Sequence, residues 1–90
     1  MKTFLITYDL FQPGQNYSGL VAELKKFPYW AHCLQSVWVV KATFSVVEIR
    51  SRLQVHLDAN DKLLVIRATR PWAGRNLDTK VADWLEKSLT

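Results

Sequence analysis

The chain has 90 residues, of which 49% are hydrophobic, and its 12 Lys and Arg against 8 Asp and Glu leave a net charge of +4. This apolar content excludes a disordered chain, and the length suits a single domain, residues 1–90, with 70–90 as its C-terminal extension. The single cysteine, Cys33, excludes an internal disulfide and a thiolate-rich zinc site. No stretch approaches the roughly 20 apolar residues of a membrane span, so we expect a soluble, cytoplasmic protein that does not bind membranes.

Residues 3–9 form an apolar, β-rich run that ends in a carboxylate. Because strand side chains alternate between faces, the face with Phe4 and Ile6 is expected to join the core. The other face, with Leu5 and Asp9, is too apolar for open solvent and too polar for a dry core. Cover by another subunit would suit it, and Asp9 would then lie at a subunit junction.

A first helix is expected after the Pro13-Gly14 turn, with Asn16 or Ser18 as its cap and Pro28 beyond its end. Its apolar stripe comprises Leu20, Val21, Leu24 and Phe27.

Residues 31–42 are rich in β-branched and aromatic side chains but long for one strand, so a break near Gln35-Ser36 is expected. That break gives a short strand and a central strand, 37–42, which suits burial on both faces. A further strand is expected over residues 62–69.

Two more helices are expected. One begins at Ser45, because Ser45-Val46-Val47-Glu48 has the form of a capping box. Its apolar side comprises Val46, Ile49, Leu53 and Leu57. The other spans residues 78–89, with an apolar stripe of Val81, Trp84, Leu85 and Leu89.

This order predicts an α+β domain with a ferredoxin-like βαββαβ antiparallel sheet, helices on one face, and an additional C-terminal helix. Right-handed crossovers place the first and third strands in the middle of the sheet and the second and fourth at its edges. The opposite sheet face, with Leu5 and Asp9, would be left bare. Two such faces can bury each other, so we expect a homodimer.

Three short motifs resemble the small CRISPR-associated Cas-two family: Tyr8-Asp9 at the end of a strand, 35–38 at the start of another, and the helix capped by Ser45. Residues 60–66 and the turn 72–74 resemble its SinR-like relatives more closely, and VapD-type toxins more distantly. The resemblance covers nearly the whole chain. It implies a ferredoxin-like homodimer in which two strand-terminal aspartates face each other.

In some members of that family the paired aspartates hold a divalent metal, Mg²⁺ in our expectation, for phosphodiester hydrolysis. Asp9 matches this position, so the resemblance makes it the candidate catalytic residue and metal ligand. Two features depart from the family. The loop 11–16 carries no charge, where members often have further acids and an arginine, and the third helix replaces the usual C-terminal strand.

The candidate nucleic-acid contacts are Ser36, from the resemblance, and three arginines around the end of the last strand, Arg67, Arg70 and Arg75. Simpler alternatives stay open for each of them. Asp9 is equally consistent with capping the following loop or pairing with a nearby Lys or Arg. Ser36 is consistent with a turn residue that bonds its own backbone, and the arginines with solvated surface.

The remaining polar and aromatic residues are expected to be structural. We expect His32 at an edge of the sheet and His56 at the end of a helix. Asp58 and Asp61 are expected in a helix-to-strand turn, and Cys33 is expected to be a small buried hydrophobic residue. The four tryptophans suit packing.

Two functions compete at this stage. The first is a nucleic-acid-binding homodimer, acting on DNA or RNA as an endonuclease if Asp9 holds a metal. The second is a non-catalytic adaptor whose bare face and C-terminal segment contact other proteins. A small-molecule enzyme ranks last, because the sequence has no cofactor motif.

Overall fold

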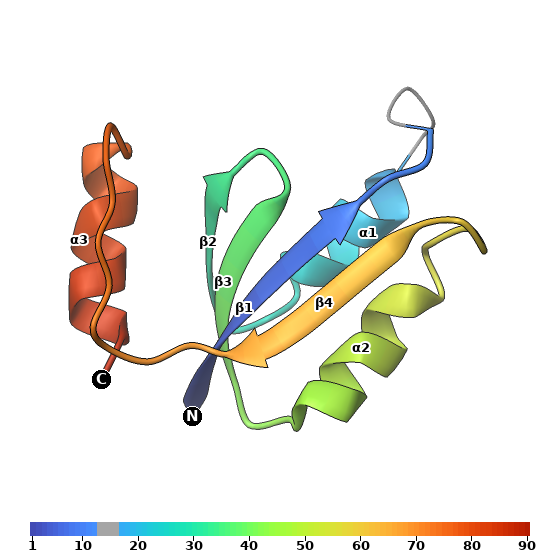
Figure 1. Ribbon diagram of the computed structural model, residues 1–90. Helices are drawn as coiled ribbons and strands as arrows, with labels where there is room; N and C mark the ends of the chain where they lie inside the picture. The colour runs from blue at the N-terminus through green and yellow to red at the C-terminus, as the bar shows by residue number, and fades with distance from the viewer. Residues whose placement is uncertain (13–16) are drawn as a thin grey trace.

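The computed structural model describes residues 1–12 and 17–90 (Figure 1). The elements in chain order are β1 (Lys2–Asp9), α1 (Ser18–Leu24), β2 (Tyr29–Leu34), β3 (Val37–Ala42), α2 (Val46–Gln54), β4 (Lys62–Arg67) and α3 (Thr79–Ser88). They form an α+β fold with one four-stranded antiparallel sheet and three helices. The expected Pro13-Gly14 turn and Asn16 cap lie outside the described residues.

The strands lie in the order β2-β3-β1-β4, so the prediction of central first and third strands is confirmed. Strand β1 is paired along both edges, with Leu5 opposite Val39 on one side and Ile66 on the other. The expected break at Gln35-Ser36 is also confirmed, because these two residues form the turn between β2 and β3.

Helices α1 and α2 cover one face of the sheet. Phe4 and Ile6 of β1 are buried there, as predicted, together with Trp38 and Val40 of β3. The helices contribute Leu20, Leu24, Ile49 and Leu53. The indole Nε1 of Trp38 donates a hydrogen bond to the Tyr8 hydroxyl at 3.0 Å, so the one polar atom of this large buried side chain is satisfied.

The capping box at Ser45 is confirmed. Ser45 Oγ accepts a hydrogen bond from the Glu48 amide at 3.1 Å, and Glu48 Oε1 accepts one from the Ser45 amide at 3.0 Å. Two details of the helix predictions are wrong. Ser18 is the first residue of α1, and Tyr17 occupies the cap position. Val46 is 38% exposed, because it lies on the first turn of α2, away from the sheet.

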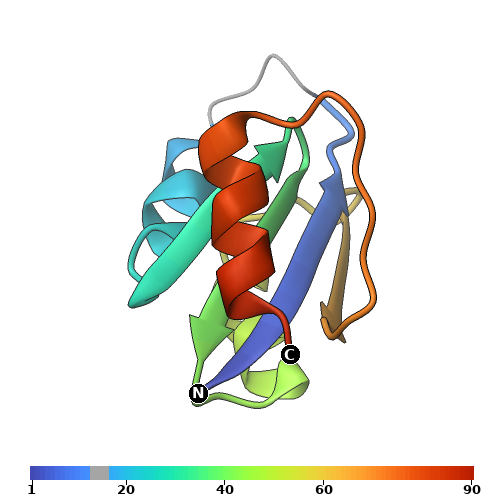
Figure 2. The ribbon, with the colours of Figure 1, turned by 90° about the vertical axis from the view of Figure 1, so that its left-hand side faces the viewer.

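Helix α3 packs against the opposite face of the sheet from α1 and α2 (Figure 2). Leu85 and Leu89 are buried there against Val39, with Leu5 and Cys33 beside them. The expectation of a wholly bare second face is therefore wrong on the β2–β3 side. The apolar stripe of α3 needs an apolar partner of its own, and this half of the sheet supplies it.

Polar contacts tie the C-terminal segment to the sheet and to α3. Thr3 Oγ1 donates to the Ser88 carbonyl at 3.1 Å. The Arg70 guanidinium donates to the carbonyls of Leu89 and Glu86 and pairs with the Glu86 carboxylate. Carbonyl groups at the end of α3 are thus satisfied by an arginine, which also suits the negative end of the helix dipole.

The second face stays open along β1 and β4 and at the ends of β2 and β3 next to the Gln35-Ser36 turn. Cross-strand partners place Leu34, Val37, Thr7 and Leu64 in one row across the sheet, and Ile66 lies two positions along β4 on the same face, opposite Leu5. We call these five residues the open strip. Leu34, Leu64 and Ile66 are 57%, 53% and 46% exposed, so the strip keeps much apolar surface in contact with water.

Replacing Leu53, which is fully buried, by alanine should lower the free energy of unfolding by about 2–5 kcal/mol, because the packed core cannot close the cavity. Val55→Ala is the matched control on the same segment, since Val55 is 74% exposed, and it should change stability by less than about 0.5 kcal/mol. Urea denaturation measures both. Equal effects of the two substitutions would contradict this packing.

Candidate functional site

Asp9 lies at the exposed end of β1, next to the open strip. Its cross-strand partner is Lys62, one row beyond Thr7 and Leu64. The carboxylate is exposed and makes no hydrogen bond or ion pair with the residues that the structure describes. Neither structural alternative for Asp9, a loop cap or an ion pair, is therefore seen in this part of the chain.

Ser36 lies beside Asp9. Both line a hollow of about 490 Å³ between the end of β1, the β2–β3 turn and the start of α1, together with Tyr8 and Tyr17. The backbone places them, since the Tyr8 amide donates to the Ser36 carbonyl at 3.2 Å. The structure thus brings together two candidate residues that are 27 positions apart in the sequence.

Asp61, which the sequence indicated only as a turn residue, accepts three hydrogen bonds. Its Oδ1 accepts from the Phe11 amide at 2.7 Å and the Tyr17 hydroxyl at 3.0 Å, and its Oδ2 from the Asp58 amide at 2.8 Å. The turn is confirmed, and Asp61 also anchors the chain on either side of residues 13–16. Its spacing from Asp58 signalled the turn, but nothing signalled the contacts to Phe11 and Tyr17.

These contacts perturb the acidity of Asp61. Partial burial raises its pKa, but the hydrogen bonds from the Phe11 and Asp58 amides and the Tyr17 hydroxyl together outweigh burial. The pKa of Asp61 therefore lies below its ordinary value, and the ionised form is the one that the fold stabilises.

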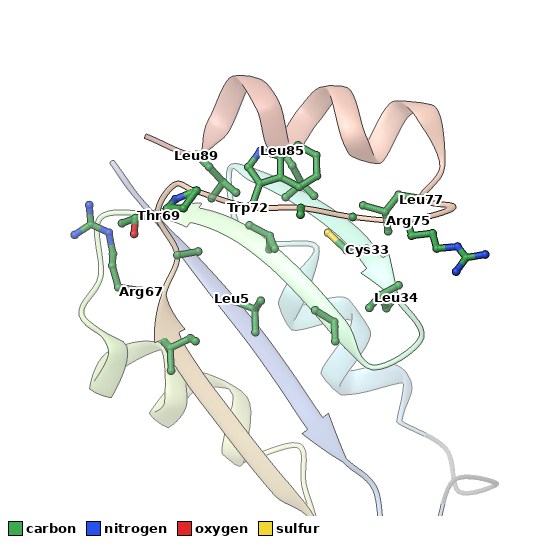
Figure 3. Close-up of a pocket in the computed structure, with 17 residues that line it drawn as sticks. Leu5, Cys33, Leu34, Arg67, Thr69, Trp72, Arg75, Leu77, Leu85 and Leu89 are labelled. Atoms are coloured by element: carbon green, nitrogen blue, oxygen red, sulfur yellow. The ribbon is translucent and has the colours of Figure 1, made fainter.

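The three candidate arginines do not form one patch. Arg70 is engaged with Glu86 and the end of α3, and this pair lowers the pKa of the Glu86 carboxyl. Arg67 and Arg75 lie at opposite ends of a groove between the second sheet face and the C-terminal segment (Figure 3). Arg67 is the cross-strand partner of Phe4, so its side chain belongs to the α1–α2 face of the sheet. Neither Arg67 nor Arg75 makes an ion pair with a described residue.

One protomer does not offer a complete cation site. Among residues 1–12 and 17–90, no three His, Cys, Asp or Glu side chains are close enough to hold one metal ion. Mg²⁺ prefers six oxygen ligands and usually retains several waters, so one carboxylate is a weak site for it. Asp9 fits a magnesium ion only if a second carboxylate comes from another copy of the chain.

The histidines and the cysteine have structural surroundings. His32 stacks on Trp38 with ring centroids 4.1 Å apart. His56, which follows the end of α2, has its Nε2 atom 3.3 Å from Oε1 of Glu23 in α1. Burial raises the pKa of the Cys33 thiol, which makes it a poor nucleophile at neutral pH. The positions of the two histidines agree with the sequence prediction, whereas Cys33 is half-buried and not buried as predicted.

The groove under α3 has a volume of about 530 Å³ and was not foreseen from the sequence. Leu5 and Val39 of the sheet and Trp72 and Leu85 of the C-terminal segment line it. It arises only because α3 and the segment before it fold back over the sheet, and no local pattern shows which face the helix will choose.

Comparisons with known proteins give no family. No family model matches the chain, and no solved structure gives a significant match. Within the described residues, every helix is too short or too polar to cross a membrane.

The contacts of Asp61 give a pH-dependent prediction. Asp61→Asn should destabilise the fold at neutral pH, because a neutral amide is a weaker acceptor for the three donors. A group whose pKa is lowered in the folded state stabilises the fold at pH values above its ordinary pKa, which is about 3.9 for Asp. This stability is lost as the pH falls through the pKa of the folded state. The difference in unfolding free energy between the two proteins should therefore be constant above about pH 5 and shrink in acid.

Asp58→Asn is the matched control, because only the backbone amide of Asp58 takes part in these contacts. Urea titrations between pH 2.5 and 7 measure the difference. A gap between wild type and Asp61→Asn that stayed constant over this whole range would show that the ionised carboxylate is not what stabilises the loop.

Proposed function

We propose that this chain is a homodimeric nucleic-acid-binding protein similar to the Cas-two and SinR-like group, with Asp9 at the dimer junction as a ligand for a divalent metal. The observation that carries the proposal is the position of Asp9, an exposed carboxylate without a described partner at the edge of an open apolar strip. The element order and the strand order β2-β3-β1-β4 support a ferredoxin-like assignment of the fold.

The open strip favours self-association. Burying a whole leucine or isoleucine side chain contributes about 1.5–3 kcal/mol, and the three most exposed residues of the strip, Leu34, Leu64 and Ile66, are each about half exposed. A twofold axis doubles their number in the interface. We therefore place the strip of one protomer against the strip of its partner, beside the groove under α3, whose edge Leu34, Val37 and Ile66 share.

A twofold axis near the ends of the two β1 strands would bring the Asp9 carboxylates together. Like charges at close range repel, so such a pair needs a compensating positive charge. Lys62 beside each Asp9 supplies part of it. A bound Mg²⁺ would supply the rest, and when bound it polarises a phosphodiester and lowers the pKa of a coordinated water.

The residues around Asp9 would hold the nucleic acid. The hollow that Asp9 shares with Ser36 leaves room for a phosphate, and the Ser36 hydroxyl is a donor of the kind that contacts phosphate oxygens. Farther from Asp9, Arg75 and Arg67, the latter at the opposite end of β4, lack described ion-pair partners and add positive potential, whereas Arg70 is neutralised by Glu86.

One observation favours the second candidate, a non-catalytic adaptor. Among the described residues, Asp9 is the only acid that lines the two hollows at the end of β1, and it belongs to no group of three or more potential metal ligands. Binding to a single-stranded oligonucleotide at increasing salt separates the two functions. Phosphate contacts release counterions and weaken steeply with salt, whereas an apolar protein interface does not.

Asp9→Asn should abolish magnesium-dependent cleavage of a labelled oligonucleotide and leave the dimer intact, because the amide cannot replace a negatively charged ligand. Asp83→Asn on the exposed side of α3 is the matched control and should retain activity. Gel assays with and without EDTA measure cleavage. Unchanged magnesium-dependent cleavage by Asp9→Asn would exclude a catalytic metal at this residue.

Ile66→Lys should shift the protein toward the monomer by at least about tenfold in the dissociation constant, since two lysines would be buried in the symmetric interface. Val47→Lys is the control, because Val47 is 55% exposed on α2, away from the strip. Sedimentation equilibrium measures both. A wild-type monomer at all concentrations, or equal association of the two variants, would reject the proposed interface.

A further inference from the structure

The groove under α3 has the size and lining of a small-molecule site. Its volume of about 530 Å³ lies within the roughly 300–1,000 Å³ range of ligand pockets. Leu5 and Val39 lie on the sheet side, and Trp72, Leu85 and Leu89 belong to the C-terminal segment (Figure 3). A hydrocarbon chain would lose its contact with water on both sides here.

The charges at the groove have one sign. Arg67 and Arg75 are its only charged lining residues among those that the structure describes, and no acid lines it. Both lack an ion-pair partner in the described chain. Arg75 lies at one end of the groove, so an anionic group at that end of an apolar chain would meet its guanidinium (Figure 3). Arg67 lies at the other end, but it is the cross-strand partner of Phe4, so its side chain belongs to the α1–α2 face of the sheet.

The groove is held open by fixed contacts. Glu86 of α3 accepts hydrogen bonds from Trp72 Nε1 at 3.2 Å and from Arg70 at 2.7 Å, and so ties residues 70–72 to the helix. At Gly74 the wall is closely packed, because a Cβ atom there would clash with the Leu77 side chain. A ligand would therefore enter a site that is largely formed before binding.

We propose that this groove binds an amphipathic anion, a single hydrocarbon chain that ends in a carboxylate or a phosphate monoester. An apolar lining with an unpaired arginine at one end and no acid disfavours a cation, an uncharged polar ligand and a bare inorganic anion. Leu34, Val37 and Ile66 lie at the edge of the groove and also belong to the open strip. A second copy of the chain would not fill the rest, because a flat sheet face cannot reach Val39, Leu85 and Leu89 beneath α3 and residues 70–77. This inference goes beyond the proposed function and does not involve Asp9.

Matched twelve-carbon compounds, used below their micelle concentrations, test the proposal on the full-length protein. The compounds are dodecanoate, dodecyl phosphate, dodecanol and dodecyltrimethylammonium. We expect the two anions to bind with the lowest dissociation constants in calorimetric titrations, and the cation to bind about tenfold more weakly or not at all. The ratio between dodecanoate and dodecyl phosphate distinguishes a carboxylate from a phosphate ligand.

Cys33 provides a site-specific readout, because it is the only thiol in the chain and it lines the groove. Saturating dodecanoate should slow alkylation of Cys33 by iodoacetamide by at least about fivefold, and Cys33→Ala should still bind dodecanoate. Equal binding of all four compounds, or anion binding that leaves the alkylation rate unchanged, would overturn the proposal.

The role of Arg75 is tested by charge removal at exposed positions, where the fold is not at risk. Arg75→Gln should weaken dodecanoate binding by about two- to fivefold, as expected for a partly exposed ion pair. Arg67→Gln is the matched control, because the Arg67 side chain lies on the other face of the sheet. Binding by Arg75→Gln equal to that by Arg67→Gln would overturn the role of Arg75. Asp9→Asn should bind dodecanoate normally, so failure of the nucleic-acid proposal would be seen separately.

Discussion

The burial of β1 on both of its faces is the constraint on which the rest of this structure depends. Phe4 and Ile6 on one face are covered by α1 and α2, while Thr3 and Leu5 on the other meet α3 and the segment that leads to it. A central strand with two apolar faces needs two layers of cover. The chain supplies all of the first layer and part of the second, and the unfinished part of the second is the open strip beside Asp9.

Much of this architecture could be predicted from the sequence because local signals specify it. The alternation in residues 3–9, the capping box at Ser45 and the break at Gln35-Ser36 each depend on neighbouring residues, and all three are confirmed. The apolar stripe of α3 could also be predicted from the sequence, but the surface that this stripe covers could not. That choice depends on contacts between distant segments, such as Thr3 with Ser88, 85 positions apart, and these leave no local pattern.

The acids near the end of β1 show the same limit. Asp61 and Asp9 both lie beside the residues that join β1 to α1, but Asp61 accepts three hydrogen bonds and Asp9 accepts none from the described chain. The three hydrogen bonds to Asp61 indicate a structural role for this residue, whereas Asp9 remains available to bind a ligand. Spacing could not distinguish the two roles, because two of the three donors to Asp61 come from residues 44 and 50 positions away.

A cross-linking experiment tests most directly whether the open strips meet and bring two Asp9 residues together. In a Cys33→Ala background, Asp9→Cys introduces one thiol at the position in question, and Gln54→Cys places the same thiol on α2 as a control. A disulfide requires Cα atoms roughly 4.4–6.8 Å apart, so only close apposition allows it. The account predicts rapid formation of a covalent dimer by the Asp9→Cys protein under mild oxidation. Cross-linking no faster than that of the Gln54→Cys control would contradict it.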